Sequence, residues 1–227
     1  MQKIGFGGGC HWCTEGVFQA LLGVVEVEQG FIQSDAPWDA WSEGVLVHFD
    51  PAIIDLGTLA EVHLRTHSAN GTYSPGGRYR SAIYVFDAHQ RQTAVLMIDH
   101  IATESGAPAR TMVLPFVAFK PSEARYQNYY RSNPDRPFCR RYIDPKLDYI
   151  RRNFAAIARP LEAGYRTERV LRIVPSGGAG GMPQTQVYDV RRSNQDATGN
   201  GHGDLGRSLL QRKCADRHQH DPDQPET

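Results

Sequence analysis

The distribution of aromatic residues sets the strongest limit on what this chain can fold into. Of its Trp, Tyr and Phe residues, all but two lie before Pro160, and only Tyr165 and Tyr188 follow it. The few apolar side chains beyond that point cannot offset the entropy lost on ordering the backbone. We therefore expect one folded domain over residues 1–158 and a disordered, low-complexity tail over residues 159–227, which contains Cys214.

The apolar pattern before residue 160 alternates between strands and helices. It predicts strands at 3–6, 24–31, 45–49, 82–86 and 112–119, and helices at 13–22, 56–66, 87–103, 121–130 and 145–154. Asp55 and Asp87 stand where an N-cap belongs. This order favours an α+β fold, a two-layer plait with a ferredoxin-like core, in which a mainly antiparallel sheet carries helices on one face.

Charge and hydropathy exclude several kinds of partner. The chain has 25 basic and 25 acidic residues, so its formal net charge is zero. This balance gives no electrostatic reason to expect binding to nucleic acid or an anionic membrane. No apolar run approaches the roughly 20 residues of a membrane span, and the start of the chain lacks the apolar stretch of a secretory signal. We expect a cytoplasmic protein.

The segment with the clearest chemistry is residues 7–15, GGGCHWCTE. Three glycines after a strand allow a tight turn and leave room above the backbone. Cys10 follows directly at a predicted helix start, where unpaired N–H groups and the positive end of the helix dipole stabilise a thiolate. The position suits a nucleophile, although a buried structural thiol is the alternative.

Cys10 and Cys13 also form a C-x-x-C pair. By itself this spacing fits a dithiol redox site, half of a zinc site, or coincidence. A zinc site needs two more ligands at a suitable spacing. Cys139 stands alone, and His63 and His67 lie four residues apart near a predicted helix end. We therefore predict no metal site.

Several segments, taken in order, resemble the peptide methionine sulfoxide reductase A family. Residues 9–15 (GCHWCTE) resemble its Gly-Cys-Phe-Trp-x-x-Glu signature, and residues 79–84 (YRSAIY) are similar to its Tyr-Arg-Ser strand motif. Residues 41–45 (WSEGV) and 49–51 (FDP) resemble its acidic motif. Phe119, residues 124–127 (ARYQ) and Tyr130 resemble its late aromatic helix, and residues 137–147 resemble the cysteine-bearing stretch of many members. The resemblance spans about residues 3–154.

The resemblance implies a reduction of methionine-S-sulfoxide in which Cys10 attacks sulfur and becomes a sulfenic acid. Glu43 is then the proton donor, and burial between apolar neighbours would favour its protonated form. Tyr79 is the hydroxyl that hydrogen-bonds the sulfoxide oxygen. Trp12, with His11 beside it, is the wall of the pocket for the substrate methyl group. Taken singly, Glu43 could be a solvated strand-edge carboxylate, Tyr79 a half-buried strand tyrosine and Trp12 a core residue.

A second thiol should resolve the sulfenic acid to a disulfide. Cys139 matches a family position for this role and lies among prolines and Asn133, in a segment that we expect to be a mobile loop. Cys13 is nearer in sequence but is fixed in direction by one helical turn, so we favour Cys139. The resemblance implies thioredoxin, or another dithiol, as electron donor, with no bound cofactor. We expect a monomer that acts on oxidised proteins or free methionine sulfoxide.

The sequence departs from the family pattern in three places. His11 replaces the usual Phe, no tyrosine occurs between residues 31 and 43, where Trp38 or Trp41 could fill the space, and Ser74 falls near the usual acidic residue before Tyr79. The alternative hypothesis is therefore a catalytically weakened member that acts as a thiol redox sensor or binding module. Keeping Cys10, Trp12, Glu43, Tyr79 and Cys139 together favours the reductase.

Overall fold

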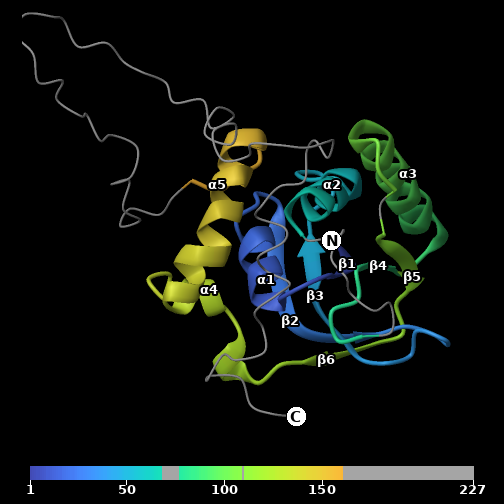
Figure 1. Cartoon of the computed structure of the whole chain (residues 1–227), viewed down its shortest axis with the longest axis horizontal. Coiled ribbons are helices and arrows are strands. Elements are labelled where there is room, and N and C mark those ends of the chain that lie inside the picture. Colours follow the sequence, from blue (N-terminus) through green and yellow to red (C-terminus); the bar gives the residue numbers. More distant parts are fainter. Residues whose placement is uncertain (68–76, 109, 161–227) are drawn as a thin grey trace, which may run out of the picture. The chain divides into compact units, whose positions relative to one another are not determined.

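The computed structural model describes residues 1–67, 77–108 and 110–160 (Figure 1). Residues 161–227 of the predicted tail, which include Cys214, lie outside the described residues. Ser74, which falls near the family's usual acidic residue, lies outside them as well. None of the described helices is long and apolar enough to cross a membrane.

The described part of the chain is a mixed α+β structure built on one six-stranded sheet. Its elements, in chain order, are β1 (Gln2–Gly7), α1 (His11–Gln19), β2 (Val24–Gln33), β3 (Ser42–Phe49), α2 (Leu56–Thr66), β4 (Ala82–Val85), α3 (Ala88–Ser105), β5 (Met112–Pro115), β6 (Ala118–Pro121), the 3₁₀ turn η1 (Ala124–Tyr126), α4 (Tyr129–Ser132), the π-helical turn η2 (Cys139–Ile143) and α5 (Asp144–Asn153).

The strand order is β5-β4-β1-β3-β2-β6. β1 lies between β3 and β4 and is antiparallel to both, while β2 is antiparallel to β3 and β6. β5 runs parallel to β4. Because β1 is central, the glycine turn that follows it leads the chain from the middle of the sheet into α1.

Helices cover one face of the sheet and enclose the main core. Phe6 of β1 and Val45 of β3 pack there with Phe18 of α1, Leu59 of α2 and Ile150 of α5. Figure 1 shows α3 beside α2, and α4 and α5 near α1, in agreement with the contacts between these elements. The N-terminus of α1 is thereby held between the sheet and the C-terminal helices.

Both predicted helix caps are confirmed. The Asp55 side chain accepts a hydrogen bond from the Thr58 N–H at 2.8 Å at the start of α2, and Asp87 accepts one from the Gln90 N–H at 2.8 Å at the start of α3. Such caps satisfy N–H groups that the helix leaves unpaired.

The prediction of one strand over residues 112–119 is wrong. This segment forms β5 and β6, which pair with opposite edges of the sheet. The two residues that link β5 to β6 bond to opposite sides of the sheet. The Phe116 N–H donates to the Val85 carbonyl of β4 at 2.9 Å, and the Val117 N–H donates to the Gln33 carbonyl of β2 at 3.0 Å. The sheet is therefore curled, and a short link can pass from one edge to the other.

The predicted helix over residues 121–130 is also wrong. Pro121 ends β6, η1 is a single turn, and Asn128 has a φ of 56° that interrupts any continuous helix. The Gln127 side chain instead bonds the backbone of Gln29 in both directions, at 3.0 and 2.7 Å. Contacts with β2 outweigh the local helical pattern here.

Candidate active site

Cys10 is the N-cap residue of α1 and is only 4% exposed. Its carbonyl oxygen accepts hydrogen bonds from the N–H groups of Cys13 and Thr14, at 3.1 and 3.2 Å. The turn before it depends on glycine, because Gly8 and Gly9 have φ values of 137° and 87°. A β-carbon on Gly8 would lie 2.4 Å from the His67 ring. The thiol therefore sits at the positive end of α1, as the sequence predicts.

Glu43 lies on β3 and is completely buried. One carboxylate oxygen accepts the Arg78 Nε–H at 2.6 Å, and the other accepts the His11 backbone N–H at 3.4 Å. The Glu43 N–H in turn donates to the Arg78 carbonyl at 2.7 Å. Glu43 is thus not a solvated edge residue. Its burial is as expected, but the sequence interpretation missed the ion pair with Arg78.

His11 is buried beside this carboxylate. Its Nδ1 lies 3.1 Å from the Gly30 carbonyl and 3.7 Å from Glu43 Oε2. Burial lowers the pKa of His11, and the nearby Glu43 opposes this effect only in part. The neutral ring therefore donates its Nδ1–H to the Gly30 carbonyl at neutral pH. It forms a T-shaped contact with Phe31, at 5.8 Å between ring centroids, and acts as an aromatic wall as well as a polar group.

Tyr79 is half-buried and interacts electrostatically with both Glu43 and Cys10. Burial raises the pKa of its hydroxyl to about 12, and the electrostatic influences of Glu43 and Cys10 act in the same direction, while Arg78 acts against them. The hydroxyl therefore remains protonated through the neutral range and can donate a hydrogen bond. Glu43, Arg78, Tyr79 and His11 form what we call the Glu43 cluster.

Trp12 lies in a group of aromatic rings from the C-terminal part of the domain. It is buried, stacks on Tyr129 with ring centroids 4.0 Å apart, and meets Phe138 edge-on at 5.7 Å. Its neighbour in the family signature, Glu15, is also buried and accepts the N–H groups of Asn128 and Tyr129, at 2.6 and 2.9 Å. Glu15 therefore anchors α4 to α1.

The prediction that Cys139 lies in a loop is wrong. Cys139 begins η2, is fully buried, and its thiol donates to the Asn133 carbonyl at 3.6 Å. Burial raises its thiol pKa to about 11, with Cys10 among the smaller influences. Proline and asparagine content suggested mobility, whereas the backbone here is helical and continues into α5.

Cys10 and Cys13 line one small cavity of about 10 Å³, which we call the thiol cavity. Its other side chains come from α2 and α5 as well as α1. The full lining is Gly8, Gly9, Cys10, Cys13, Thr14, Val17, His63, Thr66, His67 and Lys146. Both cysteines of the C-x-x-C pair therefore face a common space, together with the two histidines considered for zinc. Within residues 1–67, 77–108 and 110–160, no group of three or more His, Cys, Asp and Glu could hold a metal ion.

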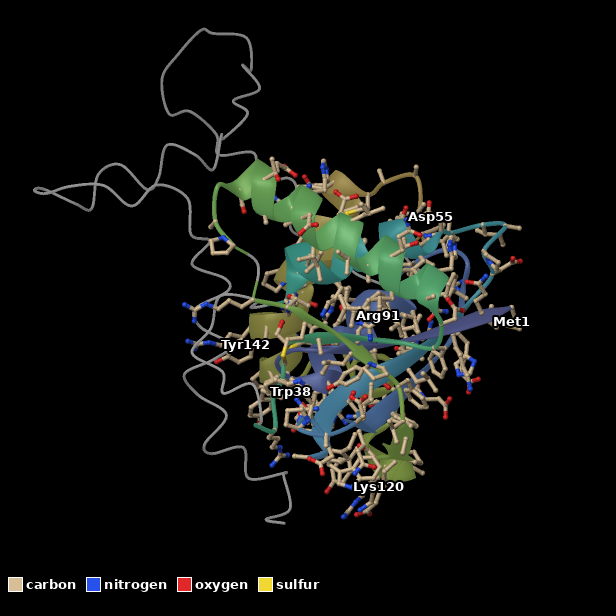
Figure 2. The ribbon with its side chains drawn as sticks, turned by 90° about the vertical axis from the view of Figure 1, so that its right-hand side faces the viewer. Met1, Trp38, Asp55, Arg91, Lys120 and Tyr142 are labelled. Carbon is tan, nitrogen blue, oxygen red and sulfur yellow. The ribbon has the colours of Figure 1, made fainter. Side chains whose placement is uncertain are left out.

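The two tryptophans suggested to replace the absent tyrosine do not join the Glu43 cluster. Trp38, which is labelled in Figure 2, is partly buried, and it packs against a cluster of buried side chains that includes Ile32 and Tyr84. Trp41 is exposed. Arg80 fixes this segment, donating to the carbonyls of Trp38 and Ala40 at 2.8 and 3.0 Å. The arginine of the Tyr-Arg-Ser motif is thus structural, a role that the sequence interpretation did not assign.

Comparison with known proteins gives a consistent result. The model of the family described as peptide methionine sulfoxide reductase matches residues 2–157. The chain is 32% identical to a peptide methionine sulfoxide reductase MsrA of Thermus thermophilus over 167 residues, covering 67% of this chain and 95% of that protein. It is 35% identical to the Chromobacterium violaceum MsrA over 171 residues, covering 68% and 97%.

A solved structure supports the fold. The reduced form of Mxr1 from Saccharomyces cerevisiae matches with a TM-score of 0.53 at 20% identity, covering 59% of this chain and 86% of the other. At that identity the match concerns the fold alone.

Proposed function

The chain belongs to the peptide methionine sulfoxide reductase family and reduces methionine sulfoxide, and from this premise we propose that Cys10 is its nucleophile. The observation that carries this assignment is the placement of the Cys10 thiol. It lies at the positive end of α1, after a turn in which two glycines have positive φ, and next to the Glu43 cluster.

In the first step, the Cys10 thiolate attacks the sulfur of the sulfoxide. The substrate sulfur is reduced to a thioether, and its oxygen passes to Cys10, which is oxidised to the sulfenic acid. The oxygen needs a proton as it leaves. We assign proton donation to Glu43 and a supporting hydrogen bond to the Tyr79 hydroxyl, which stays protonated at neutral pH. Arg78 orients the Glu43 carboxyl group.

His11 and Trp12 are our candidates for the substrate methyl pocket. Both are buried aromatic side chains in the first turn of α1, next to the nucleophile. The neutral His11 ring retains the aromatic surface of the usual Phe while its Nδ1–H is occupied by the Gly30 carbonyl.

In the second step, another thiol displaces hydroxide from the sulfenic acid and forms a disulfide. We assign this step to Cys13, reversing the preference drawn from sequence. The hydrogen bond from the Cys13 N–H to the Cys10 carbonyl closes a turn that keeps the two α-carbons within about 7 Å, a separation compatible with a disulfide. Cys139 is held by its own hydrogen bond inside η2.

The disulfide then needs an external dithiol, and the family resemblance implies thioredoxin. Oxidised proteins and free methionine sulfoxide are both proposed substrates, and the monomeric state and cytoplasmic location stay predictions.

The strand order β4-β1-β3-β2, with α1 and α2 as the crossover helices, supports our further assignment of the core to the ferredoxin-like plait.

A coupled assay tests the proposed function. The protein is supplied with thioredoxin, thioredoxin reductase and NADPH, and with the S or the R epimer of methionine sulfoxide, either free or within a peptide. We expect NADPH consumption and methionine formation with the S epimer only. The alternative is a catalytically weakened family member that acts as a thiol redox sensor or binding module. Absence of methionine with either epimer, while the thiols remain oxidisable, would support the sensor.

A further inference from the structure

The thiol cavity contains a base that the proposed function does not use. His63 of α2 lines the cavity and is 1% exposed. Among the residues that the structure describes, its Nε2 has no hydrogen-bond partner, although the atom is completely buried. Buried polar atoms are nearly always satisfied, so an exception next to two thiols calls for an explanation.

The orientation of His63 is fixed by its surroundings. The ring hydrogen-bonds the Gly7 backbone, which leaves Nδ1 as the donating nitrogen and Nε2 with a lone pair. It stacks on the His67 ring at 3.9 Å and lies 4.8 Å from the Phe6 ring, between centroids. The ring is therefore in the tautomer of a proton acceptor, and it cannot readily turn away.

We propose that His63 is the proton acceptor for the resolving step, taking the thiol proton of Cys13 so that Cys13 can attack the Cys10 sulfenic acid. This inference rests on the proposed function, since it needs the sulfenic acid that sulfoxide reduction creates. It adds a base to the second step and makes the thiol cavity the place where the disulfide closes.

The atoms and electrons of the step balance. The Cys13 proton moves to His63 Nε2, and the thiolate sulfur forms a bond to Cys10 Sγ while the Sγ–O bond breaks. The leaving hydroxide takes the proton back from His63 and becomes water. Cys10 in its sulfenic form and the Cys13 thiol are thus converted into a disulfide and one water, with no other oxidant. A cavity of about 10 Å³ is close to the space that one water molecule needs.

The groups around His63 keep its ring neutral and place a positive charge near the thiols. His67 contacts it from its own helix and Lys146 approaches from α5, while Cys10 and Cys13 face the cavity from α1. Burial lowers the pKa of His63 well below its usual value, and His67 and Lys146 lower it further. His63 is therefore neutral near neutral pH, with the lone pair of Nε2 facing the cavity, and because its protonated form is disfavoured it holds the thiol proton only until the leaving hydroxide takes it. The Lys146 ammonium donates to the Thr66 carbonyl and stabilises a thiolate in the cavity.

The test separates the two chemical steps. Reduced protein is mixed with excess methionine-S-sulfoxide and no external reductant, and quenched samples are assayed for methionine, for sulfenic acid trapped by a dione reagent, and for free thiols. The variant His63→Phe keeps the stacked ring and removes the base. His63→Gln serves if the phenylalanine variant does not fold, and His100→Gln, on the exposed face of α3, is the matched control.

We expect every protein in this set to form one methionine per chain at the wild-type rate. Disulfide formation at pH 6.5 should slow about a hundredfold in His63→Phe, a typical loss for a missing general base. Its rate should then rise about tenfold per pH unit from 6 to 8, following the thiolate fraction of Cys13, whereas the wild-type rate should stay nearly constant. A merely structural role for His63 would lower the rate without changing this pH profile.

Three results would overturn the inference. The first is wild-type disulfide kinetics in both His63 variants, the second is slower closure with an unchanged pH profile, and the third is rapid loss of sulfenic acid in Cys13→Ser. By contrast, a failure of the wild-type protein to form methionine at all would overturn the proposed function, which keeps the two failures distinguishable.

Discussion

Cys10 borders two regions with different chemistry. The Glu43 cluster presents a buried carboxyl group, a half-exposed guanidinium and a protonated tyrosine hydroxyl, groups that can stabilise or protonate an oxygen atom. The thiol cavity presents a second thiol, a buried neutral histidine and an ammonium group, groups that can deprotonate a sulfur atom and stabilise its anion.

The difference suggests a division of labour. Sulfoxide reduction requires a proton donor, and disulfide formation requires a proton acceptor, so the same local environment serves both steps poorly. Because the nucleophile is the N-cap residue of α1, a single sulfur atom can take part in both steps. Glu43 of β3 lies on one side of this helix end, and the cavity lined by α2 and α5 lies next to it as well.

The largest effect should come from the residue that the two regions share. Cys10→Ser should abolish methionine formation, because an alcohol is a far weaker nucleophile than a thiolate at neutral pH. Methionine release from the S epimer, measured by chromatography, checks this. Activity near that of the wild type would remove Cys10 from the mechanism and with it the comparison of the two regions.

A substitution in the Glu43 cluster should affect the first step only. Glu43→Gln should slow methionine formation about a hundredfold or more, because the amide cannot donate a proton as an acid does. The disulfide should close at the wild-type rate once sulfenic acid has formed. Rapid-quench sampling of both products measures this split. Equal slowing of the two steps would show that the regions are not separate.

A substitution in the thiol cavity should block the second step and leave the first step intact. Cys13→Ser should release one methionine per chain and then stall with thioredoxin as reductant, because thioredoxin acts on disulfides. Cys139→Ser, the matched control from the other buried thiol, should sustain turnover. Counting methionine per chain over time distinguishes them. Stalling of Cys139→Ser alone would return the resolving role to the residue that the sequence favoured.

The smallest effect concerns a buried carboxylate outside both regions. Burial raises the pKa of Glu15 to about 7, above its usual value of 4.5. The folded state therefore binds more protons than the unfolded state between these values. Stability attributable to Glu15 is present below pH 4.5 and is lost as the pH rises through about 7.

Glu15→Gln removes this titration. Between about pH 5 and 8 the unfolding free energy of the wild type should fall relative to that of the variant by up to about 3 kcal/mol. Urea unfolding at a series of pH values measures the difference. An advantage of the wild type that grows with pH would contradict the assignment. Rapid-quench kinetics of the same variant should leave both chemical steps intact, in contrast to Glu43→Gln.

The sequence predicted the parts of the fold that follow local rules. The apolar pattern and the Asp55 cap predicted both ends of α2 correctly. The glycines before Cys10 predicted correctly that this thiol lies at the start of a helix. Prediction failed where tertiary contacts decide the structure. Residues 112–119 have a continuous strand pattern, yet they divide between two sheet edges, because the curl that joins those edges is a property of the whole sheet.

The same limit applies to the candidate site. Glu43 and Tyr79 were found by their resemblance to family motifs, and the structure brings both close to Cys10. Arg78 directly precedes Tyr79, but nothing in its local pattern indicates an ion pair with a residue 35 positions earlier. His63 and His67 were noticed for their spacing and considered only as zinc ligands. Their place beside two thiols depends on how α2 packs against α1.

The most direct test of the two-region account is to map the disulfide that forms after one turnover. Reduced protein is given one equivalent of methionine-S-sulfoxide without reductant, alkylated, digested and analysed by mass spectrometry. The account predicts a disulfide between Cys10 and Cys13, with Cys139 alkylated as a free thiol. A disulfide between Cys10 and Cys139, with Cys13 alkylated, would contradict it.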